Sequence, residues 1–446
     1  MPSNAERAPP PRDRLELGLK LVTAITAVVG ATLGLLGFLG SQRLSEESRA
    51  QRATVDCLAA ESQLDRAWDA LGGAPLVRTI QRYTSDVRRL EEATALTRDA
   101  ELRCPDVRGR ALRIRAHVLR AQGRSSDALA AFLEALKASH GDAWSELGAG
   151  IALSDLGRYE EALAALERAG TAEPRDTAIQ LWRGNVLAAL GRHGEALAAL
   201  ERVLGLDPRD ALAHAGRANA LAGLGRDGEA LAAFARCAEL DPRSAKPHHD
   251  RGIVLRRLGR LEEGLREFET ACALEPANAL PHHGLGNVLV DLDRPREALA
   301  AYDAALALDP AFALAHAGRG TALAILERWP ESLAACERAL ALDPGDAHAH
   351  NGRGNALRSL ARNEEALAAY DRALELDARL VQAHVGRGYA LGVLARLEEA
   401  LAAYDRALAL EPELLTAHVG RSIALHVLGR EDEARAAEET ARRLRR

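Results

Sequence analysis

Residues Ala347–Leu380 read AHAHNGRGNALRSLARNEEALAAYDRALELDARL, and most of the chain repeats this stretch with small changes. The step between equivalent residues is 34 and does not drift. A proline recurs at this step, except where Ala378 replaces it, and so does a histidine. The histidines are His214, His248, His282, His316, His350, His384 and His418. A fixed period of this length predicts stacked repeats rather than one large core.

Each repeat is expected to form two short amphipathic helices. The first carries a small residue at a fixed place, such as Gly354, and ends near a turn such as 224–226 (Leu-Gly-Arg). The second opens with acidic residues, as at Glu364 and Glu365, which suit the positive end of a helix dipole. An Asp-Pro pair closes it, because a residue before proline leaves helical geometry. We expect aromatic residues to fill the gap between helices that approach at the small positions. These are Phe234, Phe268, Tyr302, Tyr370 and Tyr404.

This pattern resembles the tetratricopeptide repeat (TPR) family. Alanines sit at its small positions, for example Ala366 and Ala373, although histidine replaces the usual tryptophan and arginine such as Arg353 the usual leucine. The resemblance implies an all-α fold, a right-handed α-solenoid of about nine to ten helix pairs. From the residues before the repeats we expect one transmembrane helix and a helical connector. The expected segments are a short disordered tail (1–20), an anchor (21–42), the connector (43–108), a degenerate repeat (109–142) and nine repeats (143–446). The last repeat is expected to act as a polar C-terminal cap.

Composition narrows the functional class. Net charge is −6 with mixed signs along the helices, which argues against a nucleic-acid partner. Glycine strings such as Gly352–Gly354 follow no strand, so they do not predict a phosphate loop. No nucleophile, zinc or Walker pattern is present, so we expect no enzyme activity, no metal site and no cofactor.

The recurring histidines are too far apart to share an ion, since equivalent helices in a stack lie roughly 10 Å apart. Each is expected to pack with a ring nitrogen bonded locally. The recurring arginines are expected to pair with the carboxylate before each proline, as in Asp309 with Arg319 and Asp343 with Arg353.

Near the N-terminus, Leu21–Gln42 is a run of 22 residues without charge, long enough to cross a bilayer as a helix. A cleaved signal peptide is the alternative. We predict a single-pass membrane protein that contacts lipid through this run. The basic residues lean slightly toward repeats outside the cytoplasm. Gly30 and Gly34 form a GxxxG step that suits a homodimer of the anchor.

The connector holds Cys57 and Cys104. Two readings stay open: a disulfide between antiparallel helices, or two unpaired thiols.

The resemblance places partner binding on the concave face of the first helices. The candidate residues are Asn185, Asn219, His249, His283, Asn287, Asn351 and Asn355, with Leu147, Leu181, Ala215, Ala317 and Val385 between them. An asparagine amide can donate to and accept from a peptide backbone at once. We therefore predict a membrane-anchored scaffold that binds extended peptides or partner proteins. The alternative is a regulatory or substrate-docking subunit of a membrane-associated enzyme or of a secretion or assembly complex.

Overall fold

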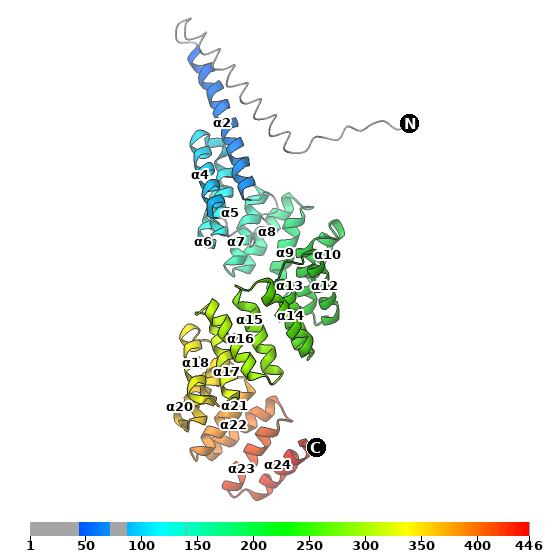
Figure 1. Cartoon of the computed structure of the whole chain (residues 1–446), viewed down its shortest axis with the longest axis vertical. Coiled ribbons are helices and arrows are strands. Elements are labelled where there is room, and N and C mark those ends of the chain that lie inside the picture. Colours follow the sequence, from blue (N-terminus) through cyan, green and yellow to red (C-terminus); the bar gives the residue numbers. More distant parts are fainter. Residues whose placement is uncertain (1–43, 72–86, 140, 446) are drawn as a thin grey trace, which may run out of the picture. The chain divides into compact units, whose positions relative to one another are not determined.

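The computed structural model describes residues 44–71, 87–139 and 141–445 (Figure 1). Regular structure over these residues is entirely helical, with 22 α-helices and one short 3-10 helix. The chain forms two compact units, one running to Arg226 and the other starting at Asp227. The predicted all-helical class is confirmed. The right-handed sense of the superhelix and the predicted segment boundaries stay predictions.

The first unit begins with two longer helices and continues with helix pairs. Its elements are α2 (Leu44–Ala70), α4 (Val87–Arg103), η2 (Pro105–Val107), α5 (Arg108–Ala121), α6 (Ser125–Ala138), α7 (Ala143–Asp155), α8 (Tyr159–Ala172), α9 (Thr177–Ala189), α10 (His193–Leu206) and α11 (Ala211–Gly223).

The second unit contains helices of 12 to 14 residues. They are α12 (Asp227–Leu240), α13 (Lys246–Arg257), α14 (Leu261–Leu274), α15 (Ala279–Asp291), α16 (Pro295–Leu308), α17 (Ala313–Ile325), α18 (Trp329–Leu342), α19 (Ala347–Ser359), α20 (Asn363–Leu376), α21 (Val381–Val393), α22 (Leu397–Leu410), α23 (Leu415–Val427) and α24 (Glu431–Leu444).

Within each unit the helices stack in one repeating order. A first helix packs on the second helix of its repeat, and that second helix packs on the next first helix, as in α15, α16 and α17. First helices of successive repeats also contact one another, for example α15 with α17 and α19 with α21. Second helices of successive repeats make no comparable contact in the described part of either unit. The first helices therefore line the inner side of each stack.

A buried side chain of the second helix, an aromatic ring in most repeats, separates successive first helices. Tyr302 of α16 is a typical case, with an exposed fraction of 1%. A Cβ added to Gly286 of α15 or to Gly318 of α17 would lie 2.5 Å from its ring. That is too close for two carbon atoms, so both positions require glycine while the ring stays in place. The expectation that small residues allow close approach around an aromatic is confirmed.

The turns between paired helices follow one design. The second helices begin after an arginine whose guanidinium pairs with the carboxylate three residues on, as Arg192 does with Glu195 at 2.8 Å and Arg362 with Glu365 at 2.7 Å. The residue before that arginine has a left-handed backbone. It is glycine in six of these turns, as at Gly259 with φ 71°. In four later turns it is another residue: Asp293, Glu327, Ala361 and Ala395 have φ between 57° and 60°.

The connector packs against the first helix pair. Leu64 and Ala67 of α2 are fully buried in one cluster with Ile114 of α5. Arg110 of α5 pairs with Asp65 at 2.5 Å and also with Glu61. These contacts tie α2 to the start of the repeats.

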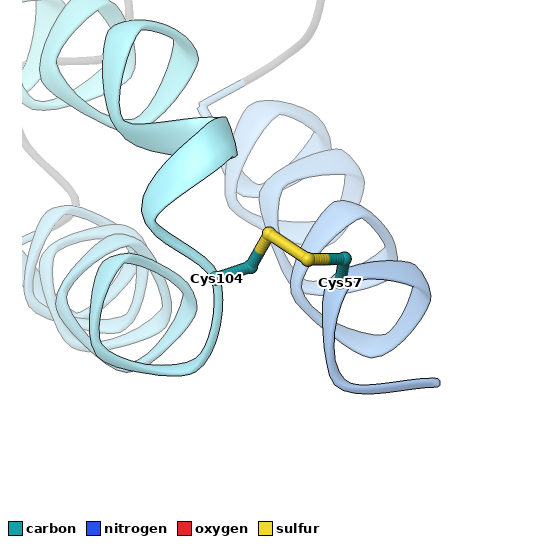
Figure 2. Close-up of a disulfide and its surroundings, with 2 residues drawn as sticks. All are labelled: Cys57 and Cys104. Atoms are coloured by element: carbon teal, nitrogen blue, oxygen red, sulfur yellow. A yellow bond between two sulfur atoms is a disulfide. The ribbon is translucent and has the colours of Figure 1, made fainter. Parts of the chain in front are cut away.

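A disulfide joins Cys57 of α2 to Cys104, which directly follows α4 (Figure 2). The two Cα atoms lie 4.9 Å apart, and the link closes a loop with a sequence separation of 47. Of the two readings left open by the sequence, the structure shows the disulfide. Cys237 and Cys336 are buried free thiols, and Cys272 is half-buried.

The predicted tail (1–20) and the predicted span Leu21–Gln42, with its lipid contact and helix dimer, lie outside the described residues. In the part of the chain that is described, no helix combines the length and the apolarity needed to cross a membrane. The long α2 shows why, since charged residues occur throughout its LSEESRAQRATVDCLAAESQLDRAWDA sequence. This finding contradicts the predicted single-pass membrane localisation with repeats outside the cytoplasm, and we do not retain it.

Replacing Ala361 or Ala395 with glycine should stabilise the second unit by roughly 0.5–1 kcal/mol each, because glycine adopts the left-handed backbone without the steric cost of a Cβ. The measurement is the urea midpoint of the full chain, followed by circular dichroism. Gly259→Ala is the matched control and should lower the midpoint. Equal midpoints for wild type and both glycine variants would contradict a left-handed backbone at these turns.

Removing the disulfide in a Cys57→Ser/Cys104→Ser variant should destabilise the connector by about 2–4 kcal/mol, because the unfolded chain regains the freedom that the link removes. Hydrogen exchange of α2 and α4 measures this effect, and amides of α19 to α22 provide the internal control. Wild-type protein treated with a reductant should behave like the variant. If oxidised wild type and variant exchange equally fast, the two sulfurs are not bonded.

Candidate partner-binding surface

All seven predicted site residues lie on first helices. Asn185 on α9 is half-buried and Asn219 on α11 is exposed, and both belong to the first unit. The second unit holds the other five, all half-buried: His249 on α13, His283 and Asn287 on α15, and Asn351 and Asn355 on α19. The first unit therefore holds two of the seven residues and the second unit holds five.

Two of the asparagines have a structural partner. The Tyr302 hydroxyl donates to Asn287 Oδ1 at 2.7 Å, and the Tyr370 hydroxyl donates to Asn355 Oδ1 at 2.8 Å. In each pair the tyrosine follows the asparagine by 15 residues. Each carbonyl oxygen therefore has one acceptor position taken, which leaves mainly the N–H groups of these asparagines for a partner. A tyrosine 15 residues after each asparagine is the sequence signal that indicates this pairing.

The two site histidines contact aromatic rings. The ring centroid of His249 lies 5.6 Å from that of Phe268, and its Nδ1 lies 3.0 Å from Asp250 Oδ1. The ring centroid of His283 lies 5.2 Å from that of Phe312, and burial lowers the pKa of its imidazole to about 4. His283 is therefore neutral at physiological pH. Its Nε2 lies 3.4 Å from Asn287 Nδ2.

Five histidines of the 34-residue series use Nε2 to contact a backbone carbonyl six residues earlier. The pairs are His214 with Pro208 at 3.1 Å, His316 with Pro310 at 3.1 Å, His350 with Pro344 at 3.2 Å, His384 with Ala378 at 3.0 Å and His418 with Pro412 at 2.9 Å. The predicted local bond is confirmed for these five. His248 differs, because its Nδ1 contacts Glu267 at 2.8 Å. Each of the five rings thus fixes the chain between one second helix and the next first helix.

The predicted arginine pairs are wrong. Arg319 pairs with Asp303 at 2.7 Å instead of Asp309, and Arg353 lies 3.6 Å from Glu337 instead of pairing with Asp343. The actual partner lies 16 residues earlier, on the preceding second helix. The predicted carboxylates are used within their own turns: Asp309 Oδ1 accepts from Ala311 N and Asp343 Oδ1 from Gly345 N, each at 2.9 Å.

One group of three described side chains has the spacing of a metal site, namely Cys57, Cys104 and Asp106. Both sulfurs belong to the disulfide, so neither is a thiolate that could bind a metal ion. This group therefore offers a single carboxylate, which does not make a metal centre.

The sequence reading missed the apolar residues at the same register. The position of Asn287 and Asn355 is occupied by Ile253 on α13, Tyr389 on α21 and Ile423 on α23, which are 47%, 49% and 58% exposed. One turn further along the last two of these helices, Val393 and Val427 are 55% and 67% exposed. By contrast, Leu147 and Leu181, which the prediction placed in the groove, are each only 1% exposed. Comparing what occupies one register position in every repeat would have revealed the exposed set.

A chain of helix pairs stacked through glycine–aromatic contacts, with one helix of each pair lining the inner side, is a helical repeat protein. Profiles described as tetratricopeptide repeat match residues 147–205, 189–245, 283–347 and 385–446, and a TPR repeat profile matches residues 354–392. These matches cover more than half of the chain, which therefore belongs to the tetratricopeptide repeat family. Repeats of this family generally serve as scaffolds for protein–protein interaction, and the repeats of this chain form such a scaffold.

Solved structures of TPR proteins are similar to the chain. YrrB, described as a TPR protein with an unusual peptide-binding site, is 26% identical over 42% of this chain and 96% of its own, with a TM-score of 0.34. A thermophilic TPR protein of Thermus thermophilus is 26% identical over 41% of this chain and 99% of its own, with a TM-score of 0.39. The APC/C hetero-tetramer Cut9–Hcn1 matches at 13% identity over 94% of this chain and 97% of its own, with a TM-score of 0.53, and supports the fold alone. No curated protein matches the chain.

Replacing Asn355 with alanine should destabilise the second unit by about 1 kcal/mol, because the buried Tyr370 hydroxyl loses its acceptor. Asn219→Ala should leave stability nearly unchanged, since Asn219 is exposed. Thermal unfolding followed by circular dichroism measures both. In a Tyr370→Phe background the Asn355→Ala change should lose most of its effect; a full effect there would show that the hydrogen bond is not its cause.

Proposed function

We propose that the chain binds extended segments of partner proteins along the first helices of its second unit. The observation that carries this proposal is the exposed apolar set Ile253, Tyr389, Val393, Ile423 and Val427 on the inner helices α13, α21 and α23. Exposed apolar side chains that gather on one face typically mark an interaction surface. In the same repeats the apolar faces of the second helices are buried, as Leu401 and Tyr404 of α22 illustrate.

Polar groups along the same helices provide the second part of the surface. Thr321 of α17 is exposed at the register of Asn287 and Asn355. These two amides keep their N–H groups, which can donate to carbonyls of a peptide whatever its side chains are. We retain the seven residues predicted from the sequence as proposed partner contacts, in a secondary role. They are Asn185, Asn219, His249, His283, Asn287, Asn351 and Asn355. In the second unit these residues add polar contacts to the partner, while the exposed apolar side chains provide most of the binding surface.

The rigidity of the helix pairs suits this function. Contacts such as Tyr302 between Gly286 and Gly318 hold successive first helices at a fixed distance. A surface that is already ordered before binding loses little conformational entropy, so more of the contact free energy remains for affinity. Most of the conformational entropy lost on binding is then lost by the flexible partner segment.

A photocrosslinking amino acid at Tyr389, in full-length protein made in the source cells, should give discrete adducts with a partner protein that mass spectrometry identifies. The matched control places the same crosslinker at Ala402, which is exposed on the second helix α22. Adding Ile423→Asp should reduce the Tyr389 adducts without affecting those from Ala402. Adducts from Ala402 alone would place the interaction on the outer helices and contradict the proposal.

A further inference from the structure

Three arginines occupy one register position on first helices: Arg120 on α5, Arg256 on α13 and Arg358 on α19. In the first two cases, the residue 35 positions later is an aspartate on the next first helix, and the two side chains pair. Arg120 Nε lies 2.5 Å from Asp155 Oδ2, and Arg256 pairs with Asp291. An arginine here thus normally bridges to a carboxylate one repeat further along.

Arg358 lacks this carboxylate. The position equivalent to Asp155 and Asp291 is Val393, and Arg358 forms no ion pair with any residue of the described ranges. Its guanidinium carbon instead lies 4.7 Å from the centroid of the Tyr389 ring on the next first helix. A guanidinium stacked on an aromatic face keeps its edge N–H groups for hydrogen bonds; here the Tyr370 hydroxyl interacts with the guanidinium, and the remaining N–H groups can bind an anion.

The surroundings of Arg358 hold the side chain in place without neutralising it. The side chain is half-buried, and its Nε is buried with no hydrogen-bond partner among the described atoms. The Tyr370 hydroxyl close to it is neutral, because burial raises the pKa of this phenol to about 12 even though the Arg358 charge opposes that shift. A positive charge fixed beside apolar residues and lacking a counter-charge is a strong anchor for a carboxylate.

Exposed apolar residues continue from this charge across two helices. Tyr389 and Val393 lie one turn apart on α21, and Ile423 and Val427 lie one turn apart on α23, which packs against α21. Next to Val427, His426 contacts Glu431 and Glu438 at 3.1 and 3.0 Å, and Glu438 also pairs with Arg442. The surface therefore places the positive charge of Arg358 beside exposed apolar side chains.

We propose that Arg358 binds the side-chain carboxylate of an aspartate or glutamate in an extended partner segment, whose neighbouring apolar side chains lie on Tyr389, Val393, Ile423 and Val427. The partner carboxylate takes the place that Asp155 and Asp291 occupy in the earlier repeats. This inference rests on the proposed function and specifies its partner chemistry: an acidic residue next to apolar ones.

The test uses the full chain and an array of octapeptides, acetylated and amidated at their ends. One position is Asp, Glu, Asn or Gln, and the others are drawn from Leu, Ile, Val, Phe, Ala and Ser. The acidic peptides should bind roughly tenfold more tightly than their amide counterparts, as is typical of a charged hydrogen bond at a half-buried site. Arg358→Gln should remove this preference while apolar peptides continue to bind.

Two further variants separate the anchor from general charge effects. Val393→Asp restores the carboxylate of the earlier repeats, so it should pair with Arg358 and abolish the acidic preference as Arg358→Gln does. Arg256→Gln removes an arginine that already has a partner and should leave the preference unchanged. Circular dichroism of all variants establishes that they fold.

The outcomes distinguish this inference from the proposed function. In one outcome, acidic peptides and their amide counterparts bind equally tightly, and Ile423→Asp weakens both. This result overturns the Arg358 anchor and supports the apolar surface. A preference seen only in a second array with free C-termini assigns the charge to a terminal carboxylate and overturns the side-chain assignment. Absence of binding by every peptide contradicts both proposals.

Discussion

The stack depends on one contact: an aromatic ring of a second helix held between two glycines of successive first helices. Tyr302 between Gly286 and Gly318 is typical, and Tyr370 lies in the same way between Gly354 and Gly386. The ring fills space that would otherwise be a cavity, and the glycines let the two backbones come close enough to enclose it. Because each ring touches its own repeat and the next, the stability of each unit is a sum of neighbouring contacts rather than the property of one core.

The same contact shapes the inner surface. A tyrosine at the ring position carries its hydroxyl to the first helix, where the carbonyl of Asn287 or Asn355 accepts its hydrogen. Where phenylalanine occupies the ring position, the residue at the asparagine register is Ile253 in the repeat of Phe268 and Asn219 in the repeat of Phe234. The two tyrosine hydroxyls thus fix the orientation of the asparagine amides that accept from them.

The charged residues are mostly satisfied within short distances. Arginine–glutamate pairs three residues apart begin the second helices, and Arg319, Arg387 and Arg421 each contact an aspartate of the preceding second helix. Exposed pairs of this kind add little stability. Their consequence is that few charges on the inner helices remain available, which makes Arg358, with no ion pair in the described ranges, a candidate for recognition rather than for folding.

From the sequence alone, the period determined the helices, the turns, the small and aromatic packing positions and the local histidine bonds. The helices, the turns and the histidine bonds depend on residues a few positions apart, as in His350 with the Pro344 carbonyl, and the packing positions follow from the repeat period itself. Only the tertiary structure decided that Arg319 pairs with Asp303 instead of Asp309, that Tyr302 occupies the carbonyl of Asn287, that Leu181 is buried, and that Cys57 bonds to Cys104. These contacts join different helices, and a repeat period gives the order of helices without giving the rotation of each about its axis, which decides the side chains that meet.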